Sequence, residues 1–327
     1  MPPVIADEKN IARAAALLKQ GRLVAFPTET VYGLGADASN PEAIKRIFEA
    51  KGRPSDHPLI VHIPHADHLA NWARNIPDDA KRLTAKFWPG PLALILNKKP
   101  EVPMEVTGGQ QTVAIRMPNH PVALRLLNAF GGGVAAPSAN RYCRISPTQA
   151  QHVEDELGDA VDLILDGGAC QVGVESTIVD FSTDKPVLLR PGQISQQTIE
   201  AFLQVELMTH RPDSSVRAPG MMAVHYAPMT LTLLCKAGDL DQIVLDNIKH
   251  HKSVGVIAYK QRINTQAAIQ IITMPQQADA YAQQIYAALR ELDRLNLDII
   301  LVEQPPVSDA WSAINDRLAK ATRPGLI

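Results

Sequence analysis

The residues best suited to chemistry lie where predicted strands end, and the first group is FPTETVYGLGADA at residues 26–38. It follows the apolar run RLVAF, which predicts a buried strand. Within a few residues it offers two threonines, a carboxylate and a tyrosine hydroxyl, followed by two glycines one residue apart. Ligands of α/β proteins bind at strand ends, so this concentration of hydrogen-bonding groups is a candidate wall of a binding site.

Four cations occupy similar positions. Lys51 and Arg53, in KGRP, stand between a predicted helix and the strand LIVHI, and His57 extends the same polar loop. Arg116 and Arg190 end the strands of AIRMP and VLLRPG. Each has an ordinary interpretation, because a cation stabilises a helix C-terminus and a strand-end arginine can be solvated. Arginine also binds carboxylate and phosphate with paired hydrogen bonds, so these cations are candidate anion contacts.

Hydroxyl and amide groups follow two more predicted strand boundaries. Ser138 and Asn140 lie in APSAN, and Glu175, Ser176 and Thr177 open ESTIVD. Turn chemistry alone can explain both groups. They share their location at strand boundaries with the four cations, although the net charge of the chain is −2, and this combination indicates more than turn chemistry. It predicts a site for a polyanion and a small polar molecule, such as ATP with an amino acid.

Other motifs carry less information. GLGADA, residues 33–38, fits the dinucleotide pattern G-x-G-x-x-A, but the next predicted helix begins only at Pro41. Glycines in a loop where the backbone must pass closely are therefore the preferred interpretation. His62, His65 and His68 are spaced by three, yet Pro64 interrupts them, so metal ligation by the protein is not expected. The sequence contains no Walker A, nucleophile-elbow or HExxH motif.

Composition limits the class of protein. The 327 residues are 46% hydrophobic and 20% charged, which is ordinary for a globular protein with two domains. The near-neutral charge disfavours binding of nucleic acid mainly through phosphates. The three isolated cysteines indicate neither a disulfide framework nor a zinc site. We see no signal peptide and no membrane-spanning run, and we expect a cytoplasmic location.

Alternating strand and helix patterns predict an α/β fold with a large mixed sheet over residues 1–207. A helix ending at Gly21 and another opening at Asn40-Pro41 have typical capping residues. Residues 208–229 lack periodicity and predict a linker. The alternation restarts over residues 230–327 and predicts a smaller α/β domain.

Seven motifs, in chain order, closely resemble the YrdC-like family of L-threonylcarbamoyladenylate synthases: PTETVYGLG, KGRPSDHPLIVHI, FWPGPLALIL, AIRMPNH, APSAN, GVESTIVD and LLRPG. PGMMAVHYAP and the second α/β domain resemble the long, two-domain form of that family. The resemblance covers nearly the whole chain. It implies a twisted mixed-sheet catalytic domain lining a positively charged cavity, plus a C-terminal Rossmann-like domain.

The reaction that the resemblance implies joins L-threonine, bicarbonate or CO₂, and ATP into threonylcarbamoyl-AMP, with release of pyrophosphate. Partner proteins would then transfer the threonylcarbamoyl group to an adenosine of tRNA. Mg²⁺ would be bound mainly through the ATP phosphates, with no metal site made by the protein.

The resemblance also implies roles for individual residues. Lys51 and Arg53 would be the catalytic cations that face the ATP phosphates. The other expected nucleotide contacts are His57, Thr112, Asn140, Ser146, Thr148, Arg190 and Tyr226, the last in a linker that would close as a lid. The expected threonine contacts are Thr30, His62, Arg116, Ser138 and Ser176, with Arg116 taking the carboxylate.

One segment departs from the family pattern. The family usually continues from SAN through a serine-glycine pair towards SPT, whereas this chain has RYCRI at Arg141–Ile145. The bulkier, more basic segment puts the contacts of Ser146 and Thr148 with the nucleotide in question.

Two other functions remain open at this stage. The first is an RNA-binding module, which the even charge balance disfavours, so direct tRNA binding is expected to be absent or weak. The second is another carbamoyl-transfer enzyme, since related domains occur within larger hydrogenase-maturation proteins. The lack of zinc-finger and acylphosphatase segments argues against that role.

Overall fold

The computed structural model describes residues 2–209, 216–222, 224–236, 238–260 and 269–322. The chain divides into two compact units. The first comprises Met1–Tyr142, Ser146–Gln171 and Glu175–Met221, and the second comprises Cys143–Ile145, Val172–Val174 and Met222–Ile327. The predicted linker, 208–229, is therefore shared between the units, and its residues 210–215 and 223 lie outside the described residues.

The first unit is built on a mixed sheet, as predicted. In the described residues its strand order is β1-β8-β2-β3-β7-β4-β6-β5-β9-β10. The strands are β1 (Val4–Ile5), β2 (Val24–Phe26), β3 (Gly33–Asp37), β4 (Ile60–His62), β5 (Leu92–Asn97), β6 (Thr112–Arg116), β7 (Val134–Ala135), β8 (Leu163–Asp166), β9 (Thr177–Asp180) and β10 (Val187–Arg190). The sheet contains parallel pairs such as β4–β6 and antiparallel pairs such as β5–β6.

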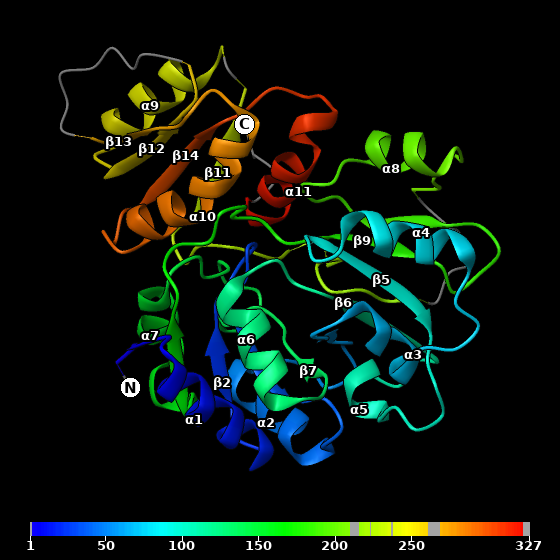
Figure 1. Ribbon diagram of the computed structural model, residues 1–327. Helices are drawn as coiled ribbons and strands as arrows, with labels where there is room; N and C mark the ends of the chain where they lie inside the picture. The colour runs from blue at the N-terminus through cyan, green and yellow to red at the C-terminus, as the bar shows by residue number, and fades with distance from the viewer. Residues whose placement is uncertain (1, 210–215, 223, 237, 261–268, 323–327) are drawn as a thin grey trace. The chain divides into compact units, whose positions relative to one another are not determined.

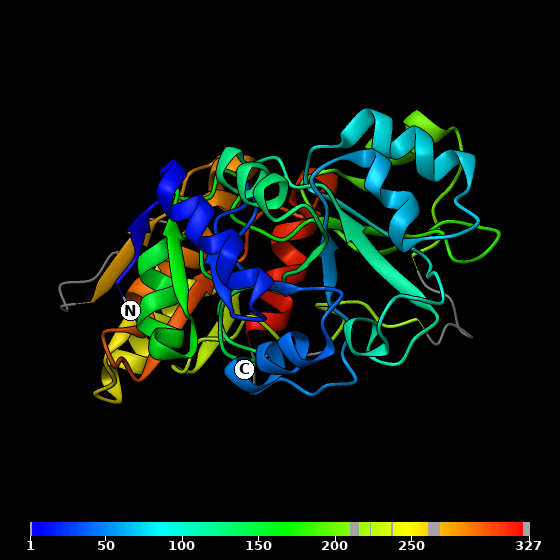
Figure 2. The same ribbon diagram turned by 60° about the horizontal axis from the view of Figure 1, so that its bottom comes forward.

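Helices cover this sheet (Figure 1). They are α1 (Glu8–Lys19), α2 (Pro41–Lys51), α3 (Leu69–Trp72), α4 (Asp78–Phe87), α5 (Met104–Thr107), α6 (Pro121–Phe130), α7 (Ala150–Leu157) and α8 (Gln196–Leu203). The predicted caps are confirmed, because Asn40 accepts N–H bonds at the start of α2 and Gly21, in the left-handed region, follows α1. Helices α1 and α6 pack side by side, as both views show (Figure 2).

The expectation that GLGAD forms a loop is wrong. Residues Gly33–Asp37 form strand β3, which pairs antiparallel with β2. The glycines are needed for packing within the sheet, because a Cβ on Gly35 would lie 2.8 Å from the Phe26 ring and 2.9 Å from Val134 Cγ1. The hydroxyl-rich segment 27–32 therefore joins the two strands of a hairpin.

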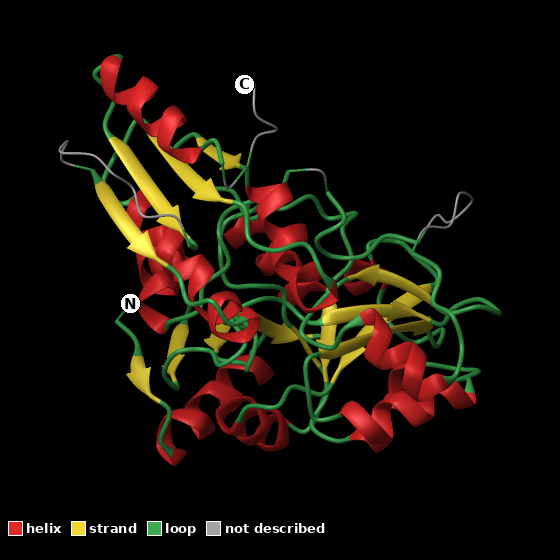
Figure 3. Ribbon diagram, turned by 90° about the horizontal axis from the view of Figure 1, so that it is seen from above, coloured by secondary structure: helices red, strands yellow, loops and turns green. Residues whose placement is uncertain are grey.

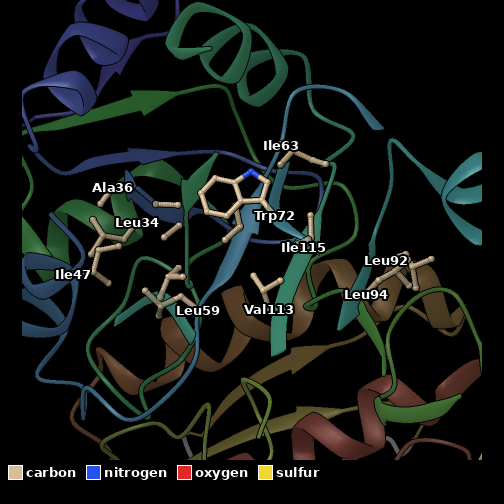
Figure 4. Packing of buried hydrophobic residues seen from close by; sticks show 14 of the residues in the cluster. Leu34, Ala36, Ile47, Leu59, Ile63, Trp72, Leu92, Leu94, Val113 and Ile115 are labelled. Carbon is tan, nitrogen blue, oxygen red and sulfur yellow. The ribbon is translucent and has the colours of Figure 1, made fainter. Parts of the chain in front are cut away.

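Alternation along the strands separates two faces of the sheet. On one face, Leu94 of β5 and Val113 and Ile115 of β6 join a large core that includes Trp72 of α3 (Figure 4). On the other face, Ile95 and Ala114 join a much smaller apolar group. That second face is where the predicted site residues of β4 and β6 point.

The second unit is a smaller α/β structure, as predicted. Its described strands are β11 (Thr232–Cys235), β12 (Val254–Ala258), β13 (Gln270–Thr273) and β14 (Ile299–Glu303), which pair in parallel in the order β11-β14-β12-β13. Figure 3 shows these strands running in one direction. The helices are α9 (Leu240–Lys249), α10 (Ala278–Asp293) and α11 (Ser312–Ala321). No described helix in either unit is long and apolar enough to cross a membrane.

Candidate active site

The floor of the candidate site is the sheet face with the small apolar group, which consists of Ile60, Ala93, Ile95, Ala114, Ile178 and Ala218. Strand register carries His62 and Arg116 onto the same face, because His62 pairs with Arg116 two residues beyond the pair Ile60–Ala114. Positions 93 and 114 are both alanines, so their side chains fill little of the space above this face. The two polar groups therefore stand at the edge of an apolar floor.

Arg116 is the centre of the expected threonine set. Its side chain is 4% exposed, and its Nη1 donates to Thr30 Oγ1 at 2.9 Å. Its Nε donates to the Gly90 carbonyl at 3.3 Å, and its Nη2 lies 2.7 Å from Glu29 Oε2. The strand-end arginine is therefore buried and held by fixed partners, so the solvated interpretation does not apply.

The turn between β2 and β3 orders its own hydroxyls. Thr28 Oγ1 donates to the Val31 carbonyl at 2.6 Å and accepts the backbone N–H groups of Thr30 and Val31 at 3.2 Å. It also lies 2.9 Å from Thr30 Oγ1. Such side-chain bonds fix the local backbone, and here they present Thr30 to Arg116.

His62 is buried beside Arg116 and is neutral. Burial, with the Arg116 charge adding, lowers the pKa of His62 to about 3. Its Nδ1 lies 3.3 Å from the Ile60 carbonyl. A neutral imidazole can donate or accept one hydrogen bond to a polar ligand without adding a charge.

Ser176 and Arg190 are in direct contact. Arg190 donates through Nε to the Ser176 carbonyl at 3.0 Å and through Nη2 to Ser176 Oγ at 3.2 Å. Its Nη1 donates to the Pro219 carbonyl at 3.0 Å. An expected threonine contact and an expected nucleotide contact are thus joined in one network that reaches the described part of the linker.

Of the two expected phosphate cations, Lys51 contacts the APSAN segment directly. Lys51, at the end of α2, donates through Nζ to the backbone carbonyls of Ser138 and Asn140, each at 2.5 Å. Arg53 donates to the Pro58 carbonyl at 3.1 Å, and its guanidinium lies 5.9 Å from the centre of the Tyr142 ring. Lys51 is 3% exposed and Arg53 is 8% exposed. Both cations are therefore buried, and neither is a surface charge that only offsets the helix dipole.

His57 and Tyr142 complete this group. Their rings meet edge to face at 5.5 Å between centroids. Burial, followed by the Arg53 charge, lowers the pKa of His57, so the imidazole is neutral near pH 7. The group therefore combines two cations with two aromatic rings, which suits phosphate and base contacts.

Residues Arg141–Ile145 depart from the family pattern, and the segment that follows them is anchored by a carboxylate. Ser146 Oγ donates to Glu175 Oε1 at 2.6 Å, and both side chains are buried. The Thr148 backbone N–H donates to His152 Nδ1 at 3.3 Å. Residues Cys143–Ile145 themselves belong to the second unit, where Arg144 pairs with Asp293 at 3.2 Å.

Thr112 and Tyr226 are the remaining expected nucleotide contacts. Thr112 begins β6, whereas Arg116 ends it, which separates their Cα atoms by roughly 13 Å. Tyr226 belongs to the second unit, where it is 1% exposed, stacks 5.8 Å from Tyr286 and lies 5.3 Å from the Arg317 guanidinium. Its φ of 63° is uncommon for a bulky residue.

Sequence reasoning assigned no role to Glu29 or Glu175. Both carboxylates are buried, at 3% and 6% exposure, and each contacts an expected site residue. Both lie inside motifs that carry the family resemblance, PTETVYGLG and GVESTIVD. Their position next to predicted ligand contacts was the sequence signal that could have identified them. Among the described residues, no three histidine, cysteine, aspartate or glutamate side chains form a group that could hold a metal ion.

Two family models match the chain. One, described as "Telomere recombination" (Sua5_yciO_yrdC), matches residues 16–192. The other, described as "Threonylcarbamoyl-AMP synthase, C-terminal domain", matches residues 194–322. The chain belongs to the Sua5/YciO/YrdC family. The family resemblance of the motifs is thereby confirmed, and so is the two-domain form.

Similar proteins extend over nearly the full length. A threonylcarbamoyl-AMP synthase of Pyrococcus abyssi is 39% identical, with 97% of this chain and 95% of that protein covered. One of Bacillus subtilis is 42% identical, with 96% and 93% covered. The crystal structure of P. abyssi Sua5 complexed with L-threonine superposes with a TM-score of 0.91 at 39% identity, covering 97% of this chain and 95% of that one.

Proposed function

We infer that this protein is an enzyme that forms threonylcarbamoyl-AMP, a nucleotidyl transfer to the carbamate of threonine. The observation that carries the conclusion is full-length similarity, at about 40% identity, to proteins with this activity in two organisms. The similarity of fold to a threonine-bound relative supports the same conclusion. The reaction uses L-threonine, bicarbonate or CO₂, and ATP, and releases pyrophosphate.

Threonine is proposed to bind at the edge of the apolar floor. Arg116 would take the carboxylate, because a buried guanidinium in fixed geometry favours an oxyanion. Thr30, Ser138 and Ser176 would surround the β-hydroxyl, with His62 supplying a neutral hydrogen-bonding group. The support is the network that already joins Arg116 to Thr30 and Arg190 to Ser176.

ATP is proposed to bind along the APSAN segment. Lys51 and Arg53 would act as the catalytic cations, His57, Asn140 and Arg190 would contact the nucleotide, and Ser146, Thr148 and Thr112 would lie around it. Tyr226 would contact the nucleotide from the linker. Mg²⁺ would enter as the ATP complex, held mainly by phosphate oxygens.

The chemistry then follows from charge and position. The ammonium of threonine loses one proton to become an amine, and the amine adds to CO₂ with loss of a second proton to give a carbamate. A carbamate oxygen then attacks the α-phosphorus of ATP while pyrophosphate leaves. Lys51, Arg53 and Arg190 would offset the negative charge that gathers on the phosphates. Positioning of the two substrates would supply much of the remaining acceleration.

We further propose that the linker forms a lid. In its described part, Arg217 pairs with Asp56 at 2.8 Å, and Ala218 packs on the apolar floor. Pro219 accepts a hydrogen bond from Arg190. Closure over bound ATP would exclude water from a product that hydrolyses readily. The strained backbone of Tyr226 supports a functional role for the HYAP segment.

Downstream, partner proteins would transfer the threonylcarbamoyl group to tRNA, with direct tRNA binding by this chain absent or weak. The cytoplasm is the proposed compartment.

A direct test of the activity is pyrophosphate release from ATP, with threonine and bicarbonate omitted in turn. Release should require both, and Arg116→Ala should raise the threonine concentration needed. Release without threonine would contradict the proposal.

A further inference from the structure

The carboxylate of Glu29 is the one charged group of the hydroxyl-rich turn. It follows strand β2 and is 3% exposed. Its Oε2 lies 2.7 Å from Arg116 Nη2, so a buried anion and a buried cation face each other beside Thr30. A surface ion pair contributes little, but a buried pair is costly to desolvate and needs compensating hydrogen bonds.

Part of this compensation is missing where the two charged groups face each other. Among the described residues, neither oxygen of Glu29 has a hydrogen-bond partner, and neither does Arg116 Nη2. The contact is short, but its orientation does not satisfy hydrogen-bond geometry. By contrast, Nη1 and Nε of the same arginine are both bonded. Three buried polar atoms, two acceptors and one donor, are therefore available at one place, and such atoms in a native protein call for a ligand or water.

The other titratable groups near Glu29 supply no second cation. Burial, followed by the Glu29 charge, raises the pKa of the Cys170 thiol, which therefore stays protonated. Burial lowers the pKa of His120, although the Glu29 charge opposes that shift, so the imidazole is neutral near pH 7. Arg116 is thus the cation that balances Glu29 among the described groups around it.

An α-amino acid matches this arrangement in charge and in hydrogen bonding. Its carboxylate accepts, its ammonium donates, and the two groups are joined through a single carbon. A neutral zwitterion added to a neutral Arg–Glu pair leaves the buried site without excess charge, which a lone carboxylate ligand would not do. The adjacent Thr30 hydroxyl is placed for the side chain of the same ligand.

We propose that Glu29 binds the α-ammonium of the amino-acid substrate, opposite the carboxylate that Arg116 binds. The proposal rests on the function inferred above and deepens it by naming the second charged contact of the amino-acid site. It makes the ammonium a condition for recognition, so the site selects free amino acids over hydroxy acids and N-blocked derivatives. If Glu29 only held Arg116 in place, affinity would not depend on the ligand's amino group.

The first experiment uses the unaltered protein and isothermal titration calorimetry. L-Threonine is compared with (R)-3-hydroxybutanoate, which keeps the carboxylate, the methyl group and the hydroxyl but lacks the amino group. Loss of one buried, charge-assisted contact weakens binding about 10-fold or more, so 3-hydroxybutanoate should bind at least that much more weakly. Equal affinity overturns the Glu29 proposal alone, whereas no binding of threonine overturns the proposed function as well.

The second experiment locates the effect at Glu29. Glu29→Gln keeps the shape and removes the charge, and Glu29→Asp keeps the charge. The Gln variant should lose about 10-fold or more in threonine affinity but little in affinity for 3-hydroxybutanoate, so that its preference for threonine largely disappears. The Asp variant should retain part of the preference.

The control variant is Asp162→Asn, which removes a carboxylate that accepts the Leu23 N–H at 2.9 Å elsewhere in the same unit. Its preference for threonine over 3-hydroxybutanoate should remain that of the unaltered protein. If Glu29→Gln weakens both ligands by the same factor, Glu29 acts only through Arg116 and the ammonium contact is wrong. If the Gln variant does not fold, the comparison in the unaltered protein decides the proposal.

Discussion

Buried cations are the main feature of this protein at the scale of single residues. Lys51, Arg53, Arg116 and Arg190 are all between 3% and 8% exposed. A buried guanidinium or ammonium is expensive unless its donors are bonded, and each of these side chains bonds to backbone carbonyls of the segments around it. The same contacts that stabilise the cations therefore orient the loops of the candidate site.

Arg53→Ala tests the assignment of the phosphate cations. The change should abolish formation of the adenylate, because the positive charge facing the triphosphate is lost. Burial of Arg53 means that the variant also loses the hydrogen bond to Pro58, with a cost of about 1 kcal/mol in unfolding free energy. Pyrophosphate release and thermal unfolding measure the two effects. Normal turnover would contradict the assignment.

His62 makes stability depend on pH. Its pKa is about 3 in the folded protein and 6.5 in the unfolded chain, so below pH 6.5 the unfolded state binds the extra proton. Its contribution is therefore fully present above pH 6.5 and is lost as pH falls towards 3, at up to ~1.4 kcal/mol per pH unit. The lowered pKa values of His57 and His120 act in the same direction.

The measurement is the unfolding free energy from urea titrations between pH 7.5 and pH 5. His62→Asn should reduce its slope with pH. An unaltered slope in the His62 variant would mean that the imidazole is protonated or solvated in the folded protein.

The proposed threonine pocket makes a prediction about substrate choice. Its hydroxyl groups, Thr30, Ser138 and Ser176, suit a β-hydroxyl, with room for one methyl group. Serine lacks that methyl and should be used less well, since one methyl contributes about 1–3 kcal/mol. Valine should fail, because it leaves hydrogen-bonding groups unpaired. Pyrophosphate release with each amino acid checks this, and equal turnover of valine would contradict the pocket assignment.

At the scale of elements, the β2–β3 hairpin positions the threonine-facing turn. Gly35→Ala would place a methyl group 2.8 Å from the Phe26 ring and 2.9 Å from Val134. Overpacking of this kind costs about 1–3 kcal/mol, and displacement of β3 should also weaken threonine binding. Gly238→Ala is the comparison, because nothing lies within 4 Å of the added methyl. Thermal unfolding should separate the two variants, and equal stability would show that the hairpin adjusts.

At the scale of the whole molecule, the proposed lid function of the linker can be tested by limited proteolysis. Trypsin cleavage after Arg217 should be fast in the free protein, because that side chain is 47% exposed. It should slow when ATP and threonine are both present, if the segment closes over them. Cleavage that does not depend on ligands would favour a static connection.

Tyr226→Ala should lower adenylate yield more than melting temperature, whereas the reverse would favour packing alone.

The sequence by itself determined the fold class, the order of most elements and the family. Alternating patterns are local. Strands β5, β6 and β14 and the caps of α1 and α2 could therefore each be predicted from one short stretch of sequence. The site motifs could likewise be collected, because each one borders a predictable strand. The interpretation of GLGAD failed, because two glycines lower the strand signal and only packing against Phe26 and Val134 explains them.

Tertiary structure alone decided which charges meet and how deeply they are buried. Arg116 and Glu29 are 87 positions apart, and Ser146 and Glu175 are 29 apart, so no local pattern records either pair. Register places Arg116 on the same sheet face as Ala114, and the β2–β3 hairpin then brings Glu29 to it. Burial turns strand-end arginines that could have been solvated into fixed groups of a site, because a buried charge must keep its partners.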